Sequence, residues 1–404
     1  MIPHDFTDAP QQGLPPDVAL REALVACLEQ QGRLVVPAIA AAMRAVPRHL
    51  FLPDVSLERA YADEAVVTKW TADHMALSSA SQPAMIAIML EQLDVVPGMH
   101  VLEIGAGTGY NAALLAHLTG PGGHVTTVDI DQDIVTAARA HLLTAGLGPE
   151  RVQVICGDGA AGYVEHAPYD RIILTAGAWD VAPAWWAQLA EGGRLVLPLA
   201  LHTVQLSAAL DRQGDVLRST SLRACGFIRL RGAFAGPETF VILDDLSQVK
   251  VLAEPPLPPV SQLAALLAST PRVLPLEDSA PTDGLRYALA FMEPHVVTVF
   301  TTPPHPLLGQ GALGLLAPEG DSACFLAWNA TGQHHPPQRV EFGAATAGLE
   351  LEHVIAHWHE LGNPTLDDWQ LTLHPRNQEI ASAADVRSFW IEKTHWQAEL
   401  HTLE

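Results

Sequence analysis

The sequence predicts an α/β fold: a parallel sheet with helices on both faces, preceded by helices and followed by a smaller α+β unit. Two observations support this prediction. Short apolar runs alternate with helical segments between residues 100 and 199, a pattern typical of a parallel sheet covered on both sides. The first run, "VLEI", leads directly into glycines 105, 107 and 109, as a strand does when it enters a nucleotide-binding turn.

The elements follow in order along the chain. Two amphipathic helices are expected between Pro16 and Leu52, and a third from Ala84 to Leu93. The central region then alternates strands and helices. Its expected strands are residues 100–104, 124–130, 152–156, 169–176 and 193–199, and its expected helices lie near 110–118, 133–145 and 183–190. Residues 202–210 and 216–232 read as strands that extend the sheet.

The composition changes near residue 235. The proline-rich stretch "AEPPLPPV" at 253–260 cannot lie inside a helix or a central strand, so we expect a linker or a surface loop there. Strand-like runs and a helix near 346–361 follow it. They predict a second unit that packs a core of its own, with Leu371 and Leu373 among its apolar positions.

Charge and cysteine content argue against several classes of protein. The formal net charge is −23, and Lys and Arg form no cluster, so neither nucleic acid nor an anionic membrane is an expected partner. The four cysteines are far apart and form no C-x-x-C pair, which favours a reducing cytoplasm over a disulfide framework. The first twenty residues contain no Lys or Arg, and we expect no signal peptide and no membrane-spanning segment.

Three carboxylates accompany the glycine-rich turn. Glu103 lies two residues before Gly105, Asp129 ends the next strand, and Asp158 follows the third strand. At the carboxyl ends of parallel strands, such side chains can accept ribose hydroxyls or reach an adenine edge. The alternative is that each carboxylate only caps the helix that follows it.

The sequence resembles the protein-L-isoaspartate O-methyltransferases, which are class I S-adenosylmethionine-dependent methyltransferases. The resemblance covers roughly residues 20–232. Its matching segments are "VPRHLFLP", "AYADEAV", "SASQPAMIAIMLEQL", "VLEIGAGTGYNAALLA", "VICGDGAAGYVEHAPYDRIILTAGA" and "QLAEGGRLVLPL". The resemblance implies a Rossmann-like methyltransferase sheet and S-adenosylmethionine as the cofactor. The residues that it implies for cofactor binding are Glu103, Gly105, Gly107, Gly109, Asp129, Asp158 and Gly159.

The acceptor segment is Ser79-Ala80-Ser81-Gln82, directly before Pro83. The family carries Thr-Ile-Ser-Gln-Pro there, so the resemblance implies that Ser81 and Ser79 are catalytic and that Ser81 bonds the substrate carboxylate. It also implies that residues 79–82 and Arg231 bind substrate. The alternatives are a serine that only caps a helix and an arginine that only lies on the surface. Ala80 replaces the family's isoleucine, which suggests a bulkier acceptor.

No metal is expected. Methyl transfer to an anionic carboxylate needs in-line alignment and exclusion of water rather than a metal or a triad. His353 and His357 are one helical turn apart, with His359 near them, a spacing that can bind zinc. A solvated helix face is the expected explanation for these histidines.

We therefore expect three regions and leave three functions open. The regions are an N-terminal helical part with the acceptor loop (1–93), an S-adenosylmethionine-binding core (94–234) and a C-terminal substrate-recognition domain (235–404). A chain ended near Ala235 is expected to keep cofactor binding. The functions are methylation of an aspartate or isoaspartate in one ribosomal peptide (lanthipeptide, graspetide or lasso type) leading to an aspartimide, general isoaspartyl repair, and a non-catalytic binding module. The C-terminal addition and Ala80 favour the first.

Overall fold

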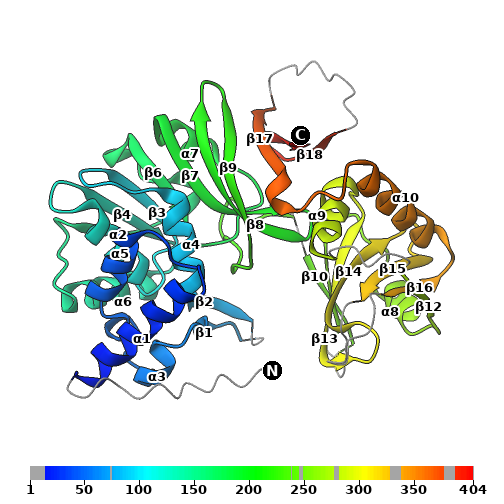
Figure 1. Cartoon of the computed structure of the whole chain (residues 1–404), viewed down its shortest axis with the longest axis horizontal. Helices are drawn as coiled ribbons and strands as arrows, with labels where there is room; N and C mark the ends of the chain where they lie inside the picture. Colours follow the sequence, from blue (N-terminus) through cyan, green and yellow to red (C-terminus); the bar gives the residue numbers. More distant parts are fainter. Residues whose placement is uncertain are drawn as a thin grey trace.

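The computed structural model describes residues 14–72, 75–237, 239–244, 249–276, 282–327, 338–376 and 387–403. Two large sheets dominate these residues, one of ten strands and one of seven, with a separate two-stranded hairpin. Figure 1 shows the ten-stranded half on the left and the seven-stranded half on the right. Within the described residues, no helix has both the length and the apolar character needed to cross a bilayer.

The parallel part of the ten-stranded sheet confirms the predicted α/β fold. Its strands are β3 (His100–Ile104), β4 (His124–Asp129), β5 (Val152–Cys156), β6 (Tyr169–Leu174) and β7 (Leu189–Leu201). β8 (Val204–Gln213) and β9 (Val216–Cys225) continue it in antiparallel fashion. The helices of this half are α1 (Pro16–Gln30), α2 (Pro37–Ala45), α3 (Leu57–Ala60), α4 (Pro83–Leu93), α5 (Tyr110–Thr119), α6 (Gln132–Thr144) and α7 (Pro183–Gln188). Most residues of β3, β4 and β6 are buried on both faces because helices cover both.

A short hairpin that the sequence pattern did not predict precedes α4. Its strands are β1 (Val66–Trp70) and β2 (Ala76–Ala80), which pair in antiparallel fashion. The acceptor segment begins within β2, at Ser79 and Ala80, and continues to Gln82.

The seven-stranded sheet is antiparallel in all its pairings. Its strand order is β10-β11-β13-β14-β15-β16-β12. The strands are β10 (Thr239–Asp244), β11 (Val249–Ala253), β12 (Arg272–Pro275), β13 (Val296–His305), β14 (Gly309–Leu316), β15 (Ser322–Ala327) and β16 (Gln338–Gly343), and the helices are α8 (Val260–Leu267), α9 (Thr282–Met292) and α10 (Thr346–Glu360). The proline-rich stretch joins β11 to α8. It is therefore a surface loop inside this unit and not a linker between units.

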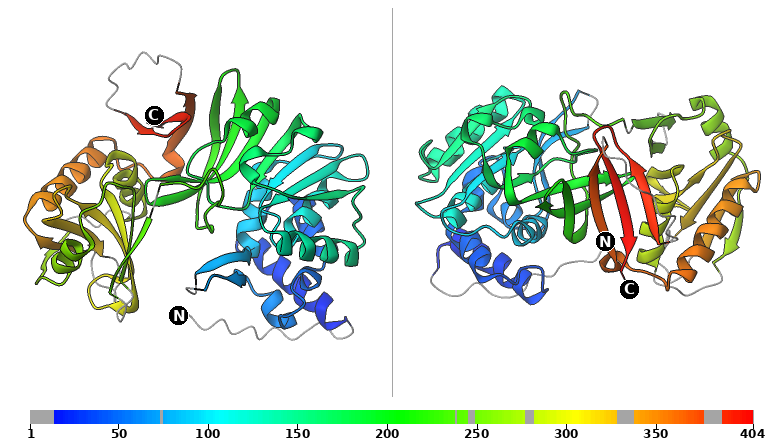
Figure 2. Two further views of the ribbon diagram at one scale, coloured as in Figure 1. Left: turned by 180° about the vertical axis from the view of Figure 1, so that it is seen from behind. Right: turned by 90° about the horizontal axis from the view of Figure 1, so that it is seen from above.

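The last strands differ from the expectation of a separate C-terminal domain. β17 (Trp369–Pro375), β18 (Ser388–Glu392) and β19 (Trp396–Thr402) belong to the ten-stranded sheet, in the order β18-β19-β17-β9. β17 pairs with β9 through Leu373 opposite Leu217 and Thr372 opposite Arg218. The view from above in Figure 2 shows these red strands between the two halves. The chain thus leaves the first sheet after β9, builds the second sheet and returns.

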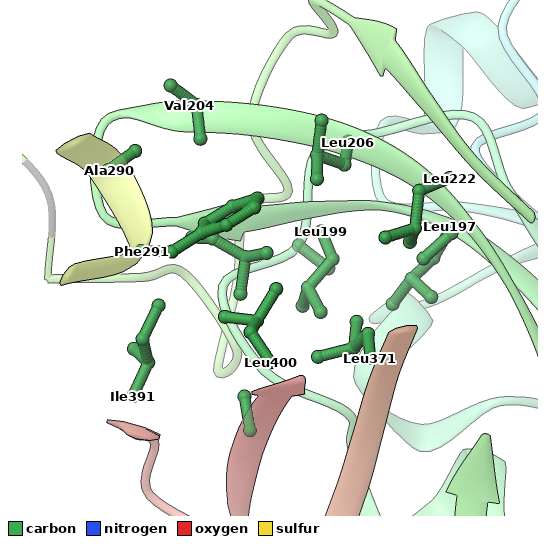
Figure 3. Packing of buried hydrophobic residues seen from close by; sticks show 14 of the residues in the cluster. Leu197, Leu199, Val204, Leu206, Leu222, Ala290, Phe291, Leu371, Ile391 and Leu400 are labelled. Carbon is green, nitrogen blue, oxygen red and sulfur yellow. The ribbon is translucent and has the colours of Figure 1, made fainter. Parts of the chain in front are cut away.

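One apolar core is shared by both halves. Leu197, Leu199, Leu206 and Leu222 of β7–β9 are buried against residues of α9 and β17–β19. Figure 3 shows Phe291, Leu371, Ile391 and Leu400 lying against them. Leu371 and Leu373 therefore pack in this shared core and not in a core of their own. A smaller cluster beneath α8, which includes Leu263, Val299 and Phe325, belongs to the second sheet alone.

A buried charge lies where the two halves meet. The Lys393 side chain is 1 % exposed, and its Nζ donates to the Ala200 carbonyl at 2.9 Å. Nζ is also 3.9 Å from Glu254 Oε1 and 4.5 Å from the Trp179 ring centroid. Glu254 Oε1 accepts a hydrogen bond from Trp179 Nε1 at 3.0 Å. Burial acts to raise the pKa of Glu254. The hydrogen bond with His202 and the charge of Lys393 outweigh this effect and lower the pKa to about 2.

Candidate active site

A cavity of about 460 Å³ lies at the carboxyl ends of the parallel strands, the position where ligands bind in open α/β sheets. The segments that line it include the glycine-rich turn after β3, the acceptor segment at the end of β2, and residues 224–231 at the end of β9 and beyond it. Its volume falls in the range of small-molecule and cofactor sites.

The glycine-rich turn presents backbone to this cavity. Gly105, Gly107 and Gly109 have φ values of 102°, 50° and 87°, a region that other residues rarely adopt. A Cβ on Gly105 would lie 2.6 Å from Thr175 Oγ1. A Cβ on Gly107 would face the Ser79 carbonyl oxygen at 3.6 Å. Gly105 and Gly107 line the cavity, whereas Gly109 packs against α6 through Leu142.

Asp129 lies at the cavity wall at the end of β4. Its Oδ2 accepts from the Gly107 N–H at 3.1 Å, and its Oδ1 accepts from the Asp131 N–H at 3.2 Å. The N-cap of α6 is Asp131, so Asp129 does not cap that helix. The helix-cap alternative therefore does not explain Asp129.

Asp158 has a different environment. It is the N-cap of the short 3-10 helix Gly159–Ala161, and its Oδ1 accepts from the Ala160 N–H at 2.9 Å. Its Oδ2 accepts from the Ala233 N–H at 2.7 Å. Asp158 thus fixes the segment that follows β9, and it is not among the residues that line the cavity, although Gly159 is.

Glu103 lies beneath the turn and not in the cavity. Its side chain is fully buried and accepts hydrogen bonds from Asn111 Nδ2 at 2.8 Å and Thr127 Oγ1 at 2.5 Å. Burial raises the pKa of Glu103 to about 7, although these two hydrogen bonds oppose the shift. The structure therefore places Glu103 as a support for the start of α5.

This raised pKa makes Glu103 a source of pH-dependent stability. Below its usual value of 4.5 the carboxyl is protonated in both the folded and the unfolded state. Between that value and about 7 the folded state binds more protons, so stability falls as pH rises. We expect the unfolding free energy of the wild type to fall, relative to Glu103→Gln, between about pH 5 and about pH 8. Urea titrations of both proteins at several pH values measure it, and a difference that is independent of pH contradicts the prediction.

The acceptor segment lies beside the glycine-rich turn. Ser79, Ala80, Ser81 and Gln82 all line the cavity. The N-cap of α4 is Gln82 and not Ser81, so the interpretation of Ser81 as a plain helix cap is wrong. The Ala80 side chain is buried in a small apolar cluster with Leu52, Ala60 and Val66.

Asp63 fixes the end of this segment. Its Oδ1 accepts from the Ala84 N–H at 2.8 Å, and its Oδ2 accepts from Gln82 Nε2 at 3.0 Å. The Gln82 side-chain amide therefore donates to Asp63. The same carboxylate accepts from the Ala84 N–H in the first turn of α4.

Arg48 is a cavity residue that the sequence analysis missed. It is 1 % exposed and lines the cavity. Its Nε donates to the Ala60 carbonyl at 3.0 Å, and its Nη2 donates to the Ser81 carbonyl at 2.9 Å. Its guanidinium carbon lies 4.9 Å from the Tyr110 ring centroid. The sequence contains one signal for this residue, since Arg48 interrupts the apolar stretch "AVPRHLFLP". An arginine that is buried within such a stretch needs hydrogen-bond partners.

Arg231 lies at the rim of the cavity in an ion-pair network. Its Nη1 and Nη2 donate to both oxygens of Asp131, at 3.2 and 2.9 Å. Lys69 of β1 donates to Asp131 at 3.0 Å and to Asp133 at 2.8 Å. The hydrogen bond from Arg231, supported by Lys69, lowers the pKa of Asp131. The network ties the β1–β2 hairpin, α6 and the segment after β9 together at the rim.

The three C-terminal histidines lie far from this cavity in the sequence, on α10. His353 is exposed, and His357 and His359 are half-buried. His359 Nδ1 lies 2.6 Å from Asn363 Oδ1. The described part of the chain contains no group of three His, Cys, Asp or Glu residues that could hold a metal ion.

Comparison with known proteins gives concordant results. The family model of protein-L-isoaspartate(D-aspartate) O-methyltransferases (PCMT) matches residues 19–234. The protein-L-isoaspartate O-methyltransferase of Methanopyrus kandleri is 39 % identical over 222 residues, which are 54 % of this chain and 95 % of that protein. The enzyme of that name from Hyperthermus butylicus is 38 % identical over 226 residues, which are 54 % of this chain and 91 % of that protein. A solved structure named as a protein-L-isoaspartate O-methyltransferase matches with a TM-score of 0.51 and 24 % identity, covering 87 % of this chain and 96 % of that one.

Proposed function

We propose, on the premise that this chain belongs to the protein-L-isoaspartate O-methyltransferase family, that it methylates isoaspartyl carboxylates in many different damaged proteins. The family consists of enzymes that use S-adenosylmethionine. The observation that carries the proposal is the single cavity lined by the glycine-rich turn, Asp129 and the acceptor segment Ser79–Gln82.

The residues present fit S-adenosylmethionine. Gly105 and Gly107 leave backbone without side chains at the cavity wall, and Asp129 offers carboxylate oxygens at the end of β4, where a ribose can be bound. Gly159 adds a further wall position without a side chain. When bound, this cofactor supplies an electrophilic methyl group. We propose Asp129, Gly105, Gly107 and Gly159 as direct binding residues, with Glu103, Gly109 and Asp158 as supports of the loops.

The protein's own contribution is alignment and desolvation. The acceptor carboxylate is already ionised at neutral pH, so no general base is required. Ser81, and Ser79 beside it, are proposed to donate hydrogen bonds that hold one carboxylate oxygen while the other faces the methyl donor. Arg48 holds the Ser81 carbonyl and so fixes the segment that presents Ser81. The half-buried segment after β9 and the Arg231–Asp131 pair limit access of water from the rim.

Two findings move the preference from one dedicated peptide to general repair. The fold shared with the solved structure covers 87 % of this chain and so extends past residue 234, which means that a C-terminal addition does not by itself indicate a dedicated enzyme. The Ala80 side chain packs against Leu52, Ala60 and Val66, so it gives no clear reason to expect a bulkier acceptor. Modification of one ribosomal peptide is the second candidate: the named relatives match only 54 % of this chain, so its seven-stranded sheet is available for such a partner.

A panel of isoaspartyl peptides of unrelated sequence tests the proposal. We expect methylation of most of them, seen as the gain of one methyl group followed by loss of methanol as a succinimide forms. Calorimetric binding of S-adenosylmethionine without methylation of any peptide would support a non-catalytic module instead. Methylation confined to one ribosomal peptide would support the second candidate.

The cofactor assignment predicts the effect of Asp129→Ala. A charged acceptor contributes roughly 1.5–3 kcal/mol per hydrogen bond, so affinity for S-adenosylmethionine is expected to fall by at least about tenfold. Calorimetry on the folded variant measures this loss, with Asp133→Ala as the exposed control on α6. Unchanged affinity in Asp129→Ala contradicts the assignment.

The acceptor assignment predicts the effect of Ser81→Ala. Loss of one aligning contact is expected to lower kcat by about 10–100-fold, while affinity for S-adenosylmethionine stays within about twofold of the wild type. Steady-state kinetics and cofactor titration on the same sample separate the two effects. Equal losses of turnover and of cofactor binding would mean that Ser81 only supports the loop.

A further inference from the structure

At one end of the seven-stranded sheet, three apolar side chains are exposed on the same face. Val241 and Leu243 of β10 pack toward the cluster beneath α8, so Phe240 and Ile242 point to the opposite face. Phe240 is 39 % exposed, Ile242 is 52 % exposed, and Phe300 of β13 is 39 % exposed. The rings of Phe240 and Phe300 have centroids 6.1 Å apart. We call Phe240, Ile242 and Phe300 the apolar platform.

The same face is covered elsewhere along the sheet. Over β14 and β15 it packs against α10, and Leu313 and Leu326 belong there to the shared core. On β13, Thr298 Oγ1 donates to Thr203 Oγ1, in the turn between β7 and β8, at 3.1 Å. Within the part of the chain that the structure describes, this cover ends before the platform. The platform therefore faces the methyltransferase half without being buried by it.

Arg229 connects the platform to the cavity. Arg229 is among the residues that line the cavity, and its guanidinium carbon lies 4.8 Å from the Phe240 ring centroid, within range of a cation–π contact. The backbone of Arg229 bridges to Gly177, which holds it in the wall of the cavity. One residue, Arg229, thus contacts both the cavity and the platform.

A polypeptide substrate has to extend beyond the cavity. A volume of about 460 Å³ suffices for a cofactor and roughly one residue, so the neighbours of that residue must lie on the rim. Figure 1 shows the β1–β2 hairpin to the left of β10 and β13, with β8 above them. The hairpin exposes a further aromatic side chain, Trp70.

We propose that the apolar platform binds bulky apolar side chains of the substrate polypeptide that flank its isoaspartyl residue. This inference rests on the proposed function and names the kind of segment that the enzyme selects. Bulky apolar side chains are buried in intact proteins and become accessible where a damaged chain is locally unfolded. Contacts on the platform, remote from the reacting carboxylate, orient the isoaspartyl residue in the cavity.

Methylation of two isoaspartyl peptides by the full-length protein tests this proposal. One peptide is short and polar, and the other continues with several Phe and Leu residues. We expect Phe240→Ala/Ile242→Ala to raise KM for the longer peptide by about tenfold, because two apolar contacts are lost, with kcat unchanged. KM for the short peptide is expected to stay the same. Phe300→Ala is a second variant with the same expectation, and Val273→Ala, an exposed apolar residue on β12 at the other edge of the sheet, is the control.

The other outcomes overturn the platform in distinguishable ways. Equal KM for the longer peptide in the wild type and in both platform variants means that substrate does not lie there. An effect only in Trp70→Ala places the apolar contact on the hairpin. A fall in kcat for both peptides means that Phe240 acts on the cavity through Arg229. If the wild type binds S-adenosylmethionine but methylates neither peptide, the proposed function is rejected, and the platform proposal is rejected with it.

Discussion

A chain ended at Ala235 is expected not to fold, in contrast to the expectation from sequence alone. The shortened chain keeps β7, β8 and β9 but loses α9, α10 and β17–β19, which pack on their shared-core side. Leu197, Leu199, Leu206 and Leu222 are all almost completely buried there. Exposing each costs about 1.5–3 kcal/mol, and the sum is comparable with the roughly 5–15 kcal/mol that holds a typical domain together.

Thermal unfolding and size-exclusion chromatography of the shortened chain measure this effect. We expect no cooperative transition and no binding of S-adenosylmethionine. Addition of residues 236–404 as a separate chain is the control, since it supplies β17 to pair with β9. A soluble chain ended at Ala235 that melts cooperatively and binds the cofactor would falsify the shared core and restore the boundary expected from sequence.

Replacement of Lys393 is expected to cause the second-largest effect. In Lys393→Met the methionine fills much of the space, but Glu254, whose pKa is held at about 2, loses the charge of the ammonium group 3.9 Å away. Breaking a buried pair by removing one partner destabilises by about 3–5 kcal/mol. Urea unfolding, followed by tryptophan fluorescence, measures the loss of unfolding free energy.

The double variant Lys393→Met/Glu254→Gln serves as the control for this pair. If the cost arises from an uncompensated carboxylate, the double variant is expected to recover most of the stability that the single variant loses. A double variant that is as unstable as the sum of the two single variants shows that Lys393 stabilises the protein only through Ala200 and Trp179. The activity of the folded variants then reports whether this junction also supports the cavity.

The parallel core was predictable because its signal is local. β3, β4 and β5 are short apolar runs bounded by Gly or Asp, and helical segments separate them. The return of β17 to β9 was not predictable, because Leu373 and Leu217 face each other across a long stretch of sequence and nothing local specifies the pairing. The same limit explains why the shared core was read as two cores.

The residues of the cavity were also only partly predictable from the sequence. The glycine-rich turn and residues 79–82 follow from chain order and a family resemblance, and the structure brings them to one cavity. Arg48 and Arg229 were missed because a charged residue in sequence is expected at the surface. Only the packing of Tyr110 and Phe240 against them shows where these guanidinium groups lie. Burial of Glu103 beneath the turn likewise depends on the fold around it.

The return of β17 to β9 also sets an order of events on the ribosome. The Leu371 N–H donates to Ser219 Oγ of β9 across 152 residues of chain, and at roughly 5–20 residues per second the intervening chain takes roughly eight to thirty seconds to synthesise. During that time β9 is an unpaired sheet edge, and the shared-core leucines of β7–β9 are exposed to solvent. Such edges and apolar surfaces promote incorrect association of nascent chains. This protein is therefore expected to need chaperone cover while it is being made, and to gain its activity only after residue 402 has emerged.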